Sequence, residues 1–290
     1  MDNNIKPDYN IKSDNPPGTL FIVATPMGNL EDMSFRAIRV LKEVDLIAAE
    51  DTRHSRRLLD HYGIQTRMIS CHEHNEDKKS IQLIEALKTG KNIALISDAG
   101  TPLISDPGYR LVKTAADQEI SIIPIPGCNA AITGLSVAGL PTDSFLFCGF
   151  LPKKAQKQCQ ILEGFKSEKA TLIFYESPKR ICTVIKRARK ILGNRRACLA
   201  REITKLHEEY IRGDLSKILS ILELRERIKG ECVLYIHGAG DPPEMTLEQI
   251  EEIILSRLDQ KIGTADLARK ISAEYQLPKK QIYDTILRLR

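Results

Sequence analysis

The sequence has no tryptophan and few aromatic residues of any kind. Phe, Tyr and Trp together make up 5% of its 290 residues. RNA-binding domains of the RRM type stack several bases on aromatic side chains, so this composition argues against such a stacking platform. The sequence also has no run of about 18 apolar residues, the length that a membrane-spanning helix needs. We therefore expect no membrane partner.

Two common glycine-rich nucleotide-binding motifs, GxGxxG and GxxxxGK[ST], are absent as well. The first apolar segment ends in TPMG (residues 25–28), where a proline stands among the backbone amides that would face a pyrophosphate. The seven cysteines are an odd number without a CxxC pair, which argues against a disulfide framework. The sequence thus predicts a reduced, cytoplasmic protein that is not a dinucleotide-binding enzyme.

From residue 18 onward, short apolar runs alternate with amphipathic segments, which is typical of an α/β protein with a largely parallel sheet. The pattern predicts strands over 19–24, 45–49, 68–71, 92–97, 121–125, 144–148, 170–175, 197–201, 209–212 and 232–237. It predicts helices over 34–42, 52–62, 75–88, 106–116, 155–166, 178–192 and 215–229. Asp106 and Pro107 have the residue types of a helix cap and a first helical position.

Changes in composition divide the chain into four parts. We expect a polar, disordered tail over 1–17, an α/β domain over 18–125, a second α/β domain over 126–241 and a helical module over 242–290. The module has predicted helices over 247–258, 264–274 and 279–287, of which the last two resemble a helix-turn-helix. A helical cap packed on the second domain is the alternative.

The net charge of +5 is unevenly distributed. Between Lys153 and Arg196, thirteen Lys and Arg face three Glu, so this stretch carries +10 and the rest of the chain −5. Within the predicted helix 178–192, the cations at positions 186, 187, 189 and 190 have no acidic residue three or four positions away. A polyanion such as RNA would compensate this charge, although a solvated helix face also accounts for it.

Ligands of open α/β sheets bind outside the carboxyl ends of the strands. The apolar strand expected at 92–97 ends in Ser97, Asp98, Ala99 and Gly100. The Asp98 carboxylate can accept hydrogen bonds from ribose hydroxyls or an ammonium group, and Gly100 allows a ligand to approach the backbone. Small residues also open a helix at 126–131, where free backbone amides suit a flat adenine.

Two clusters of ionisable residues precede expected helices in the first domain. Asp51 and Arg53 follow a strand, and the acidic group there can cap the helix or line an active site. His72 and Glu73 belong to the segment HEHNE, whose spacing lacks the further ligands of a zinc site. Contact with RNA or with the active site, a plain loop and a metal site are the alternatives for this segment, and we expect no metal.

A third cluster, Glu176 with Lys179 and Arg180, ends a strand in the second domain. Cations are unfavourable at a helix N-terminus unless an anion neutralises them. A phosphate group is the simplest such anion.

Several motifs occur in one order along the chain: LFIVATPMGNL (20–30), AEDTR (49–53), CHEHNE (71–76), SDAGTP (97–102), ISDPG (104–108), PGC (126–128), FYESPKR (174–180), REITK (201–205) and GEC (230–232). In these motifs the chain resembles the tetrapyrrole methylase superfamily of S-adenosylmethionine enzymes, and within it the branch that methylates ribosomal RNA. The resemblance implies two α/β domains with S-adenosylmethionine in the cleft between them, and a homodimer. It implies 2′-O-methylation of a cytidine in the decoding region of 16S ribosomal RNA, in free RNA or in the small ribosomal subunit.

The resemblance and the clusters above together give three sets of candidate residues. The cofactor candidates are Met27, Ser97, Asp98, Ala99, Gly100, Ile104, Cys128, Asn129, Ala130, Tyr175, Glu202 and Val233. The catalytic candidates are Asp51, Arg53, His72, Glu73, Glu176 and Lys179. The RNA-binding candidates are Arg180, Lys186, Arg187, Arg189, Lys190 and Lys205.

Two other functions remain open at this point. One is a tetrapyrrole methylase with a porphyrinoid substrate, against which the TPMG loop stands, because such enzymes usually have a glycine-rich loop there. The other is a non-catalytic RNA-binding or ribosome-assembly factor with a degenerate cofactor cleft.

Overall fold

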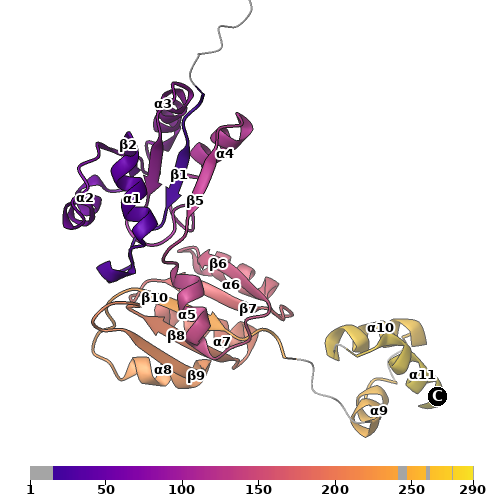
Figure 1. Cartoon of the computed structure of the whole chain (residues 1–290). Coiled ribbons are helices and arrows are strands. Elements are labelled where there is room, and N and C mark those ends of the chain that lie inside the picture. Colours follow the sequence, from indigo (N-terminus) through magenta and orange to yellow (C-terminus); the bar gives the residue numbers. More distant parts are fainter. Residues whose placement is uncertain (1–15, 241–246, 259–261, 276, 290) are drawn as a thin grey trace, which may run out of the picture. The chain divides into compact units, whose positions relative to one another are not determined.

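The computed structural model describes residues 16–240, 247–258, 262–275 and 277–289 (Figure 1). The chain divides into two compact units, one that ends at Gly238 and one that begins at Ala239. The predicted tail at 1–17 falls almost wholly outside the described residues. None of the helices in these ranges is long and apolar enough to cross a membrane.

The first half of the α/β unit is built on a five-stranded parallel sheet, as predicted. Its strands are β1 (Leu20–Val23), β2 (Leu46–Ala49), β3 (Met68–Ser70), β4 (Ile93–Ile96) and β5 (Ile122–Ile125), in the order β3-β2-β4-β1-β5. Helices α1 (Phe35–Glu43) and α2 (Thr52–His61) pack on one face, and α3 (Glu76–Lys88) and α4 (Tyr109–Asp117) pack on the other. Strand β4 is buried along its whole length because both faces of the sheet are covered.

The start of α4 differs from the prediction. The helix begins at Tyr109, not at residue 106, and the N-cap is Gly108, with a φ of 125° that favours glycine. The buried Glu76 of α3 accepts hydrogen bonds from the backbone amides of Gly108 and Arg110 at 3.2 and 2.8 Å. The helix is therefore capped from a neighbouring element, and the prediction that Asp106 is the cap is wrong.

The second half contains a mixed sheet of β6 (Phe145–Phe150), β7 (Thr171–Glu176), β8 (Arg196–Arg201), β9 (Glu209–Asp214) and β10 (Cys232–Ile236). Its order is β6-β7-β10-β8-β9, and only β6 and β7 pair in parallel. A largely parallel arrangement is thus wrong for this sheet. Residues 202–208 alone connect β8 to β9, which is too short for the crossover that parallel strands need.

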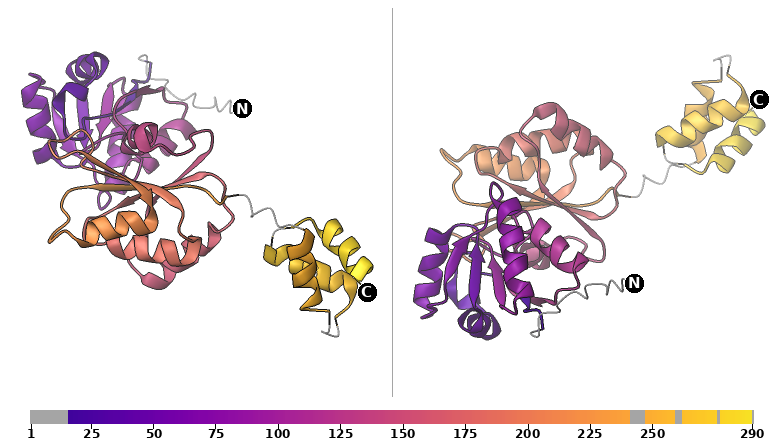
Figure 2. Two further views of the ribbon diagram at one scale, coloured as in Figure 1. Left: turned by 90° about the horizontal axis from the view of Figure 1, so that it is seen from below. Right: turned by 90° about the horizontal axis from the view of Figure 1, so that it is seen from above.

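Helices cover the two faces of the second sheet unequally (Figures 1 and 2). Helices α6 (Ala155–Gly164), α7 (Ile181–Leu192) and α8 (Leu215–Glu223) pack on one face, and α5 (Ala130–Ala138) packs on the other. Helix α5 lies close to β10, since a Cβ atom at Gly134 would be 2.1 Å from the Tyr235 hydroxyl. Met27, from the loop after β1, joins the apolar cluster under α5. The two halves therefore share part of their core.

The C-terminal unit consists of α9 (Leu247–Leu255), α10 (Thr264–Tyr275) and α11 (Lys279–Leu289), close to the predicted helices. It has an apolar core of its own, formed by Ile250, Ile254, Leu267, Ala268, Ile271, Ile282 and Ile286. This unit can therefore bury its apolar helix faces without help from the sheets.

Candidate active site

A cavity of about 330 Å³ lies beyond the carboxyl ends of β1 and β4, where loops of both halves of the α/β unit meet. Its size is within the range of small-molecule sites, roughly 300–1,000 Å³. It is lined by Met27, Ala99, Gly100, Thr101, Ile104, Ser105, Asp106, Asn129, Ala130, Phe150, Tyr175, Glu176, Ser177, Pro178, Ile203, Glu231, Cys232 and Val233. The position agrees with the rule that ligands of parallel sheets bind at this edge.

The loops after β1 and β4 are tied together at the cavity wall. The backbone amides of Thr25 and Gly100 each donate to the other residue's carbonyl oxygen at 2.9 Å. The buried Thr25 hydroxyl donates to the Ser97 carbonyl oxygen at 3.1 Å. The Thr101 hydroxyl in turn donates to the carbonyl oxygen of Cys128, just before α5, at 2.9 Å. The cavity wall from the first half is therefore anchored to the helix that covers the second sheet.

The start of α5 is held from the second sheet as well. Asn129 caps the helix by accepting from the Ile132 amide at 3.2 Å. The Tyr175 hydroxyl of β7 accepts from the Ala131 amide at 3.2 Å, and the Tyr235 hydroxyl of β10 donates to the Ala130 carbonyl at 2.8 Å. These contacts fix the small residues of the helix start against the cavity.

Strained backbone conformations occur in two loops of the same cavity. Five described non-glycine residues have a positive φ, and four of them, Leu103, Ser105, Glu202 and Thr204, lie in the two loops that contribute Ile104 and Ile203 to the lining. Left-handed conformations cost energy in residues with a Cβ atom, and they concentrate at binding sites and active sites. The strain therefore indicates that both loops are shaped for a ligand.

Asp106 is the most perturbed acid of the cavity wall. Its pKa is raised to about 6: burial is the largest cause, the negative charge of Glu50 adds to it, and a hydrogen bond with Ser97 opposes the shift. Burial together with the Asp98 charge also raises the pKa of Glu50. A carboxylate with a pKa this close to neutral pH can take up and release a proton in a reaction.

The other two acids of the cavity wall are neutralised by cations. Glu176 pairs with Arg180 at 2.8 Å, and Glu231 pairs with Lys205 at 3.1 Å. Asp106 has no ion pair within the described part of the chain, and the lining includes no Lys or Arg. The cavity therefore favours a ligand that carries positive charge.

Eight of the twelve cofactor candidates line this cavity: Met27, Ala99, Gly100, Ile104, Asn129, Ala130, Tyr175 and Val233. Ser97 and Cys128 are not part of the lining, but their carbonyl oxygens accept the hydrogen bonds from Thr25 and Thr101 that hold the cavity wall. The Asp98 carboxylate accepts from the Asp51 amide at 3.1 Å. Glu202 bonds the Lys205 ammonium and the Glu231 amide, at 3.1 and 2.9 Å.

Of the catalytic candidates, Glu176 alone lines the cavity. Asp51 is the N-cap of α2 and accepts from two backbone amides, which lowers its pKa. Arg53 is exposed in the first turn of that helix, and Glu73 is exposed in the turn before α3. The His72 ring contacts the Asn75 amide at 3.2 Å, and its Nδ1 is buried without a hydrogen-bond partner among the residues that the structure describes. Lys179 is exposed in the turn before α7.

The RNA-binding candidates are more paired than the sequence indicated. Lys186 pairs with Glu223 of α8 at 2.7 Å. The interpretation that the charge of Lys186 is uncompensated is therefore wrong, because its acidic partner lies on another helix. Arg187 contacts Gln158, and Arg189 donates to the Ser216 hydroxyl at 3.2 Å. Lys190 is exposed on the same helix. Since Arg180 is neutralised by Glu176, its charge needs no phosphate.

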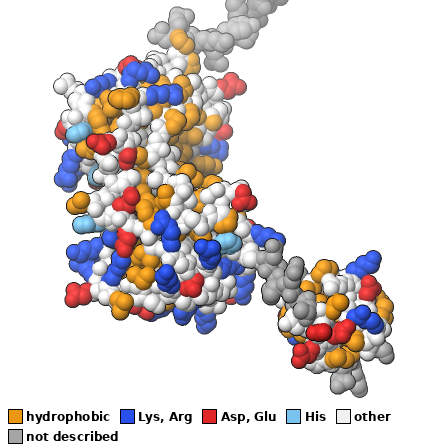
Figure 3. All heavy atoms as spheres, turned by 60° about the horizontal axis from the view of Figure 1, so that its bottom comes forward, with side chains coloured by type: hydrophobic (Ala, Val, Ile, Leu, Met, Phe, Trp, Pro, Cys, Tyr) orange, Lys and Arg blue, Asp and Glu red, His pale blue; other side chains and the backbone are white. Residues whose placement is uncertain are grey.

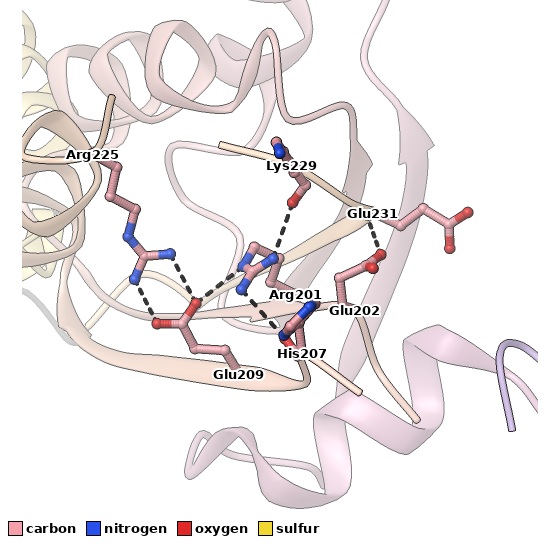
Figure 4. Close-up of polar contacts among 7 residues, drawn as sticks. All are labelled: Arg201, Glu202, His207, Glu209, Arg225, Lys229 and Glu231. Atoms are coloured by element: carbon pink, nitrogen blue, oxygen red, sulfur yellow. Dashed lines mark hydrogen bonds and ion pairs between the residues drawn. The ribbon is translucent and has the colours of Figure 1, made fainter. Parts of the chain in front are cut away.

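A second group of ion pairs braces the strands behind the cavity (Figure 4). Arg201 of β8 and Arg225 after α8 both bind Glu209 of β9, at 3.0 and 2.9 Å. Arg201 also donates to the carbonyl oxygens of His207 and Lys229, at 3.3 and 3.1 Å. The cluster thus holds the β8–β9 loop and the start of β10, both of which contribute to the cavity wall.

Sequence reasoning missed several lining residues, among them Thr101, Ser105, Asp106, Phe150, Ile203 and Cys232. Thr101 and Ser105 belong to motifs that were recognised, so their position beside Gly100 and Ile104 was a usable signal. Phe150 and Ile203 come from a sheet edge and a hairpin loop, and the sequence has no local feature that brings these two residues to the first half.

Residues 19–219 match the family described as Tetrapyrrole (Corrin/Porphyrin) Methylases. Among solved structures, the chain is similar to a diphthine synthase, with a TM-score of 0.60 and 14% identity over 76% of this chain and 90% of that one. It is similar to uroporphyrin-III-C-methyltransferase from Thermus thermophilus, with a TM-score of 0.55 and 17% identity over 76% and 94% of the two chains. At these identities the structures support the fold alone.

Closer relatives share sequence over most of the chain. The chain is 46% identical to the ribosomal RNA small subunit methyltransferase I of Halalkalibacterium halodurans, over 92% of this chain and 94% of the relative. It is 49% identical to the protein of that name from Pseudomonas aeruginosa, over 78% and 80%. The chain therefore belongs to the tetrapyrrole methylase family, and within it to the group of ribosomal RNA small subunit methyltransferase I proteins.

Proposed function

We propose that this protein methylates the 2′-oxygen of a cytidine in the decoding region of small-subunit (16S) ribosomal RNA. The family makes it a methyltransferase with S-adenosylmethionine as methyl donor. The names of the relatives support small-subunit ribosomal RNA as substrate, which implies a cytoplasmic protein. The observation that carries the proposal is the cavity, in which eight cofactor candidates surround an acid with a pKa near 6.

The cavity wall fits this donor in charge and polarity. S-adenosylmethionine carries a sulfonium and an ammonium group against one carboxylate, and the wall has an uncompensated acid but no Lys or Arg. Met27, Ile104 and Val233 offer apolar contact, while Asn129 and the backbone beside Gly100 offer polar groups. These residues would hold the donor, which supplies an electrophilic methyl group when it is bound.

Methyl transfer to a ribose hydroxyl also requires a group that removes the proton. Asp106 is mostly ionised at pH 7, since its pKa is about 6, and it lines the cavity. We assign it the role of proton acceptor for the 2′-hydroxyl. Its low solvation strengthens its attraction for that proton, and the buried Ile203 adds an apolar side chain to the same wall.

We also propose that the protein acts as a homodimer through the outer face of α5 and the edge strand β6. Ile132 and Val137 of α5, and Phe145 and Phe150 of β6, are exposed apolar side chains. Strand β6 is an edge of its sheet, where one row of backbone groups has no strand partner. Val137→Lys should convert a dimer to a monomer in light scattering, and a wild-type monomer at all concentrations would contradict the proposal.

Calorimetry with S-adenosylmethionine tests the site, and Met27→Lys is the matched variant because it places a cation in the cavity. The wild type should bind the donor, and the variant should lose most of that affinity. Donor binding by Lys190→Met, which changes an exposed side chain on α7, should be unaffected. No binding by the wild type would favour a non-catalytic factor, and methylation of a porphyrinoid instead of RNA would favour a tetrapyrrole methylase.

A further inference from the structure

Helix α2 has an exposed basic face. Arg53, Arg56 and Arg57 are exposed, and Arg53 stands in the first turn. Asp60 is the only acidic residue inside the helix. None of the three arginine side chains forms an ion pair or hydrogen bond within the described part of the chain, unlike Lys186 on α7, which pairs with Glu223.

This charge arrangement works against the helix that carries it. A helix N-terminus favours negative charge, yet the first turn of α2 holds Arg53 and no acid. Arg53, Arg56 and Arg57 are spaced by three and four residues, at which like charges on a helix repel. Asp51 and Asp60 offset part of this repulsion through their negative charges, but three arginines outnumber these two acids, and a bound polyanion would relieve the remainder.

The helix starts at the cavity. Asp51, its N-cap, donates its backbone amide to the Asp98 carboxylate at 3.1 Å. The next residues of that loop, Ala99 and Gly100, line the cavity. The basic face thus begins within a few residues of the cavity wall.

Lys and Arg side chains lie in several patches on the visible surface of the α/β unit, not in one continuous region (Figure 3). Net charge alone therefore does not locate an RNA surface. Both α2 and α7 begin near the cavity wall, and α2 differs from α7 in the pairing of its cations: its three arginines are unpaired within the described residues, whereas Lys186, Arg187 and Arg189 of α7 have partners.

We propose that the exposed arginine face of α2 binds the phosphate backbone of the RNA substrate and holds the target ribose over the cavity. The proposal rests on the proposed function for the choice of RNA as substrate. An acidic cavity repels the phosphates that flank the target ribose, and the arginines of α2 offset this repulsion beside it. The sequence analysis predicted RNA contact by the cations of α7, so α2 and α7 are competing candidates for the RNA surface.

The test compares three double variants that each remove two positive charges. R56Q/R57Q changes α2, and R189Q/K190Q changes α7. The control, K42Q/K91Q, changes exposed cations at the end of α1 and just before β4. Both positions precede strands, so they lie toward the amino-terminal ends of the first sheet, and the cavity lies beyond the carboxyl ends. Glutamine preserves helix propensity, so all three should fold, which thermal unfolding checks.

The readouts are the affinity for a small-subunit ribosomal RNA transcript at 50 and 200 mM salt, and the affinity for S-adenosylmethionine. Two phosphate contacts account for about a tenfold change in affinity over this salt range. Between 50 and 200 mM salt, the RNA affinity of R56Q/R57Q should therefore fall by a factor that is about ten times smaller than the factor for the wild type. Its affinity for S-adenosylmethionine should be unchanged. The control should match the wild type in both.

A salt dependence in R56Q/R57Q equal to that of the wild type would overturn the proposal. A reduced salt dependence in R189Q/K190Q instead would assign the RNA surface to α7. A wild type that binds the donor but transfers no methyl group to RNA would refute the proposed function. In that case the salt dependence of RNA binding still decides the role of α2.

Discussion

Glu209 offers a quantitative test of the ion-pair cluster behind the cavity. Its carboxylate binds the Arg225 and Arg201 guanidinium groups, and the hydrogen bond with Arg225 contributes most to lowering the pKa of Glu209 from 4.5 to about 2. This difference corresponds to at most about 3.4 kcal/mol of folding free energy. Because the Glu209 side chain is 31% exposed, water screens the cluster, and we expect Glu209→Gln to cost about 1–2 kcal/mol at pH 7.

The pH dependence has a definite sign. A carboxyl whose pKa is lower in the fold than in the unfolded chain stabilises the fold above pH 4.5, and this contribution disappears as the pH falls toward 2. Urea unfolding at pH 7, 5, 4 and 3 should therefore give curves for the wild type and Glu209→Gln that converge with decreasing pH. Glu163→Gln removes a pair with Lys166 in which both side chains are more than half exposed, so its effect should stay below about 1 kcal/mol. A cost for Glu209→Gln that is absent at pH 7, or constant with pH, would refute this reasoning.

Two further changes test the site itself. Asp106→Asn should lower kcat/KM for methyl transfer by about 10²- to 10⁴-fold, and the wild-type kcat/KM should fall below about pH 6, where the carboxyl becomes protonated; a wild-type profile that is flat from pH 5 to 8 would contradict the assigned role. Gly134→Ala should destabilise the protein by about 1–3 kcal/mol, because the added Cβ atom would lie 2.1 Å from the Tyr235 hydroxyl; urea unfolding measures this, and an unchanged midpoint would show that α5 moves freely away from β10.

Local patterns were sufficient for the first half of the fold. Strand β4 is a continuous apolar run between polar turns, and each helix of that half buries one apolar face, so strand and helix positions were predictable within a few residues. The strands of the second sheet were predicted as well, but their antiparallel directions were not, because strand direction depends on pairing between distant segments. The short 202–208 connection was the one local signal of an antiparallel pair there.

The site shows the same division between local and distant information. Motifs gave the residues that follow β4 and begin α5, such as Gly100 and Asn129. Asp106 was mistaken for a helix cap, because the group that caps α4 is Glu76, thirty residues earlier in the chain. Lys186 was taken as uncompensated for the same reason, since Glu223 comes from another helix. Pairing across elements is a property of the fold, and single-sequence patterns do not contain it.

The most direct test of the proposed reaction is a map of 2′-O-methyl groups on small-subunit ribosomal RNA from cells with and without this protein. The account predicts that one cytidine in the decoding region loses its 2′-O-methyl group when the protein is absent, and regains it when the purified protein and S-adenosylmethionine are added. An identical map in both cell types, or a lost methyl group on a base instead of a ribose, would contradict it.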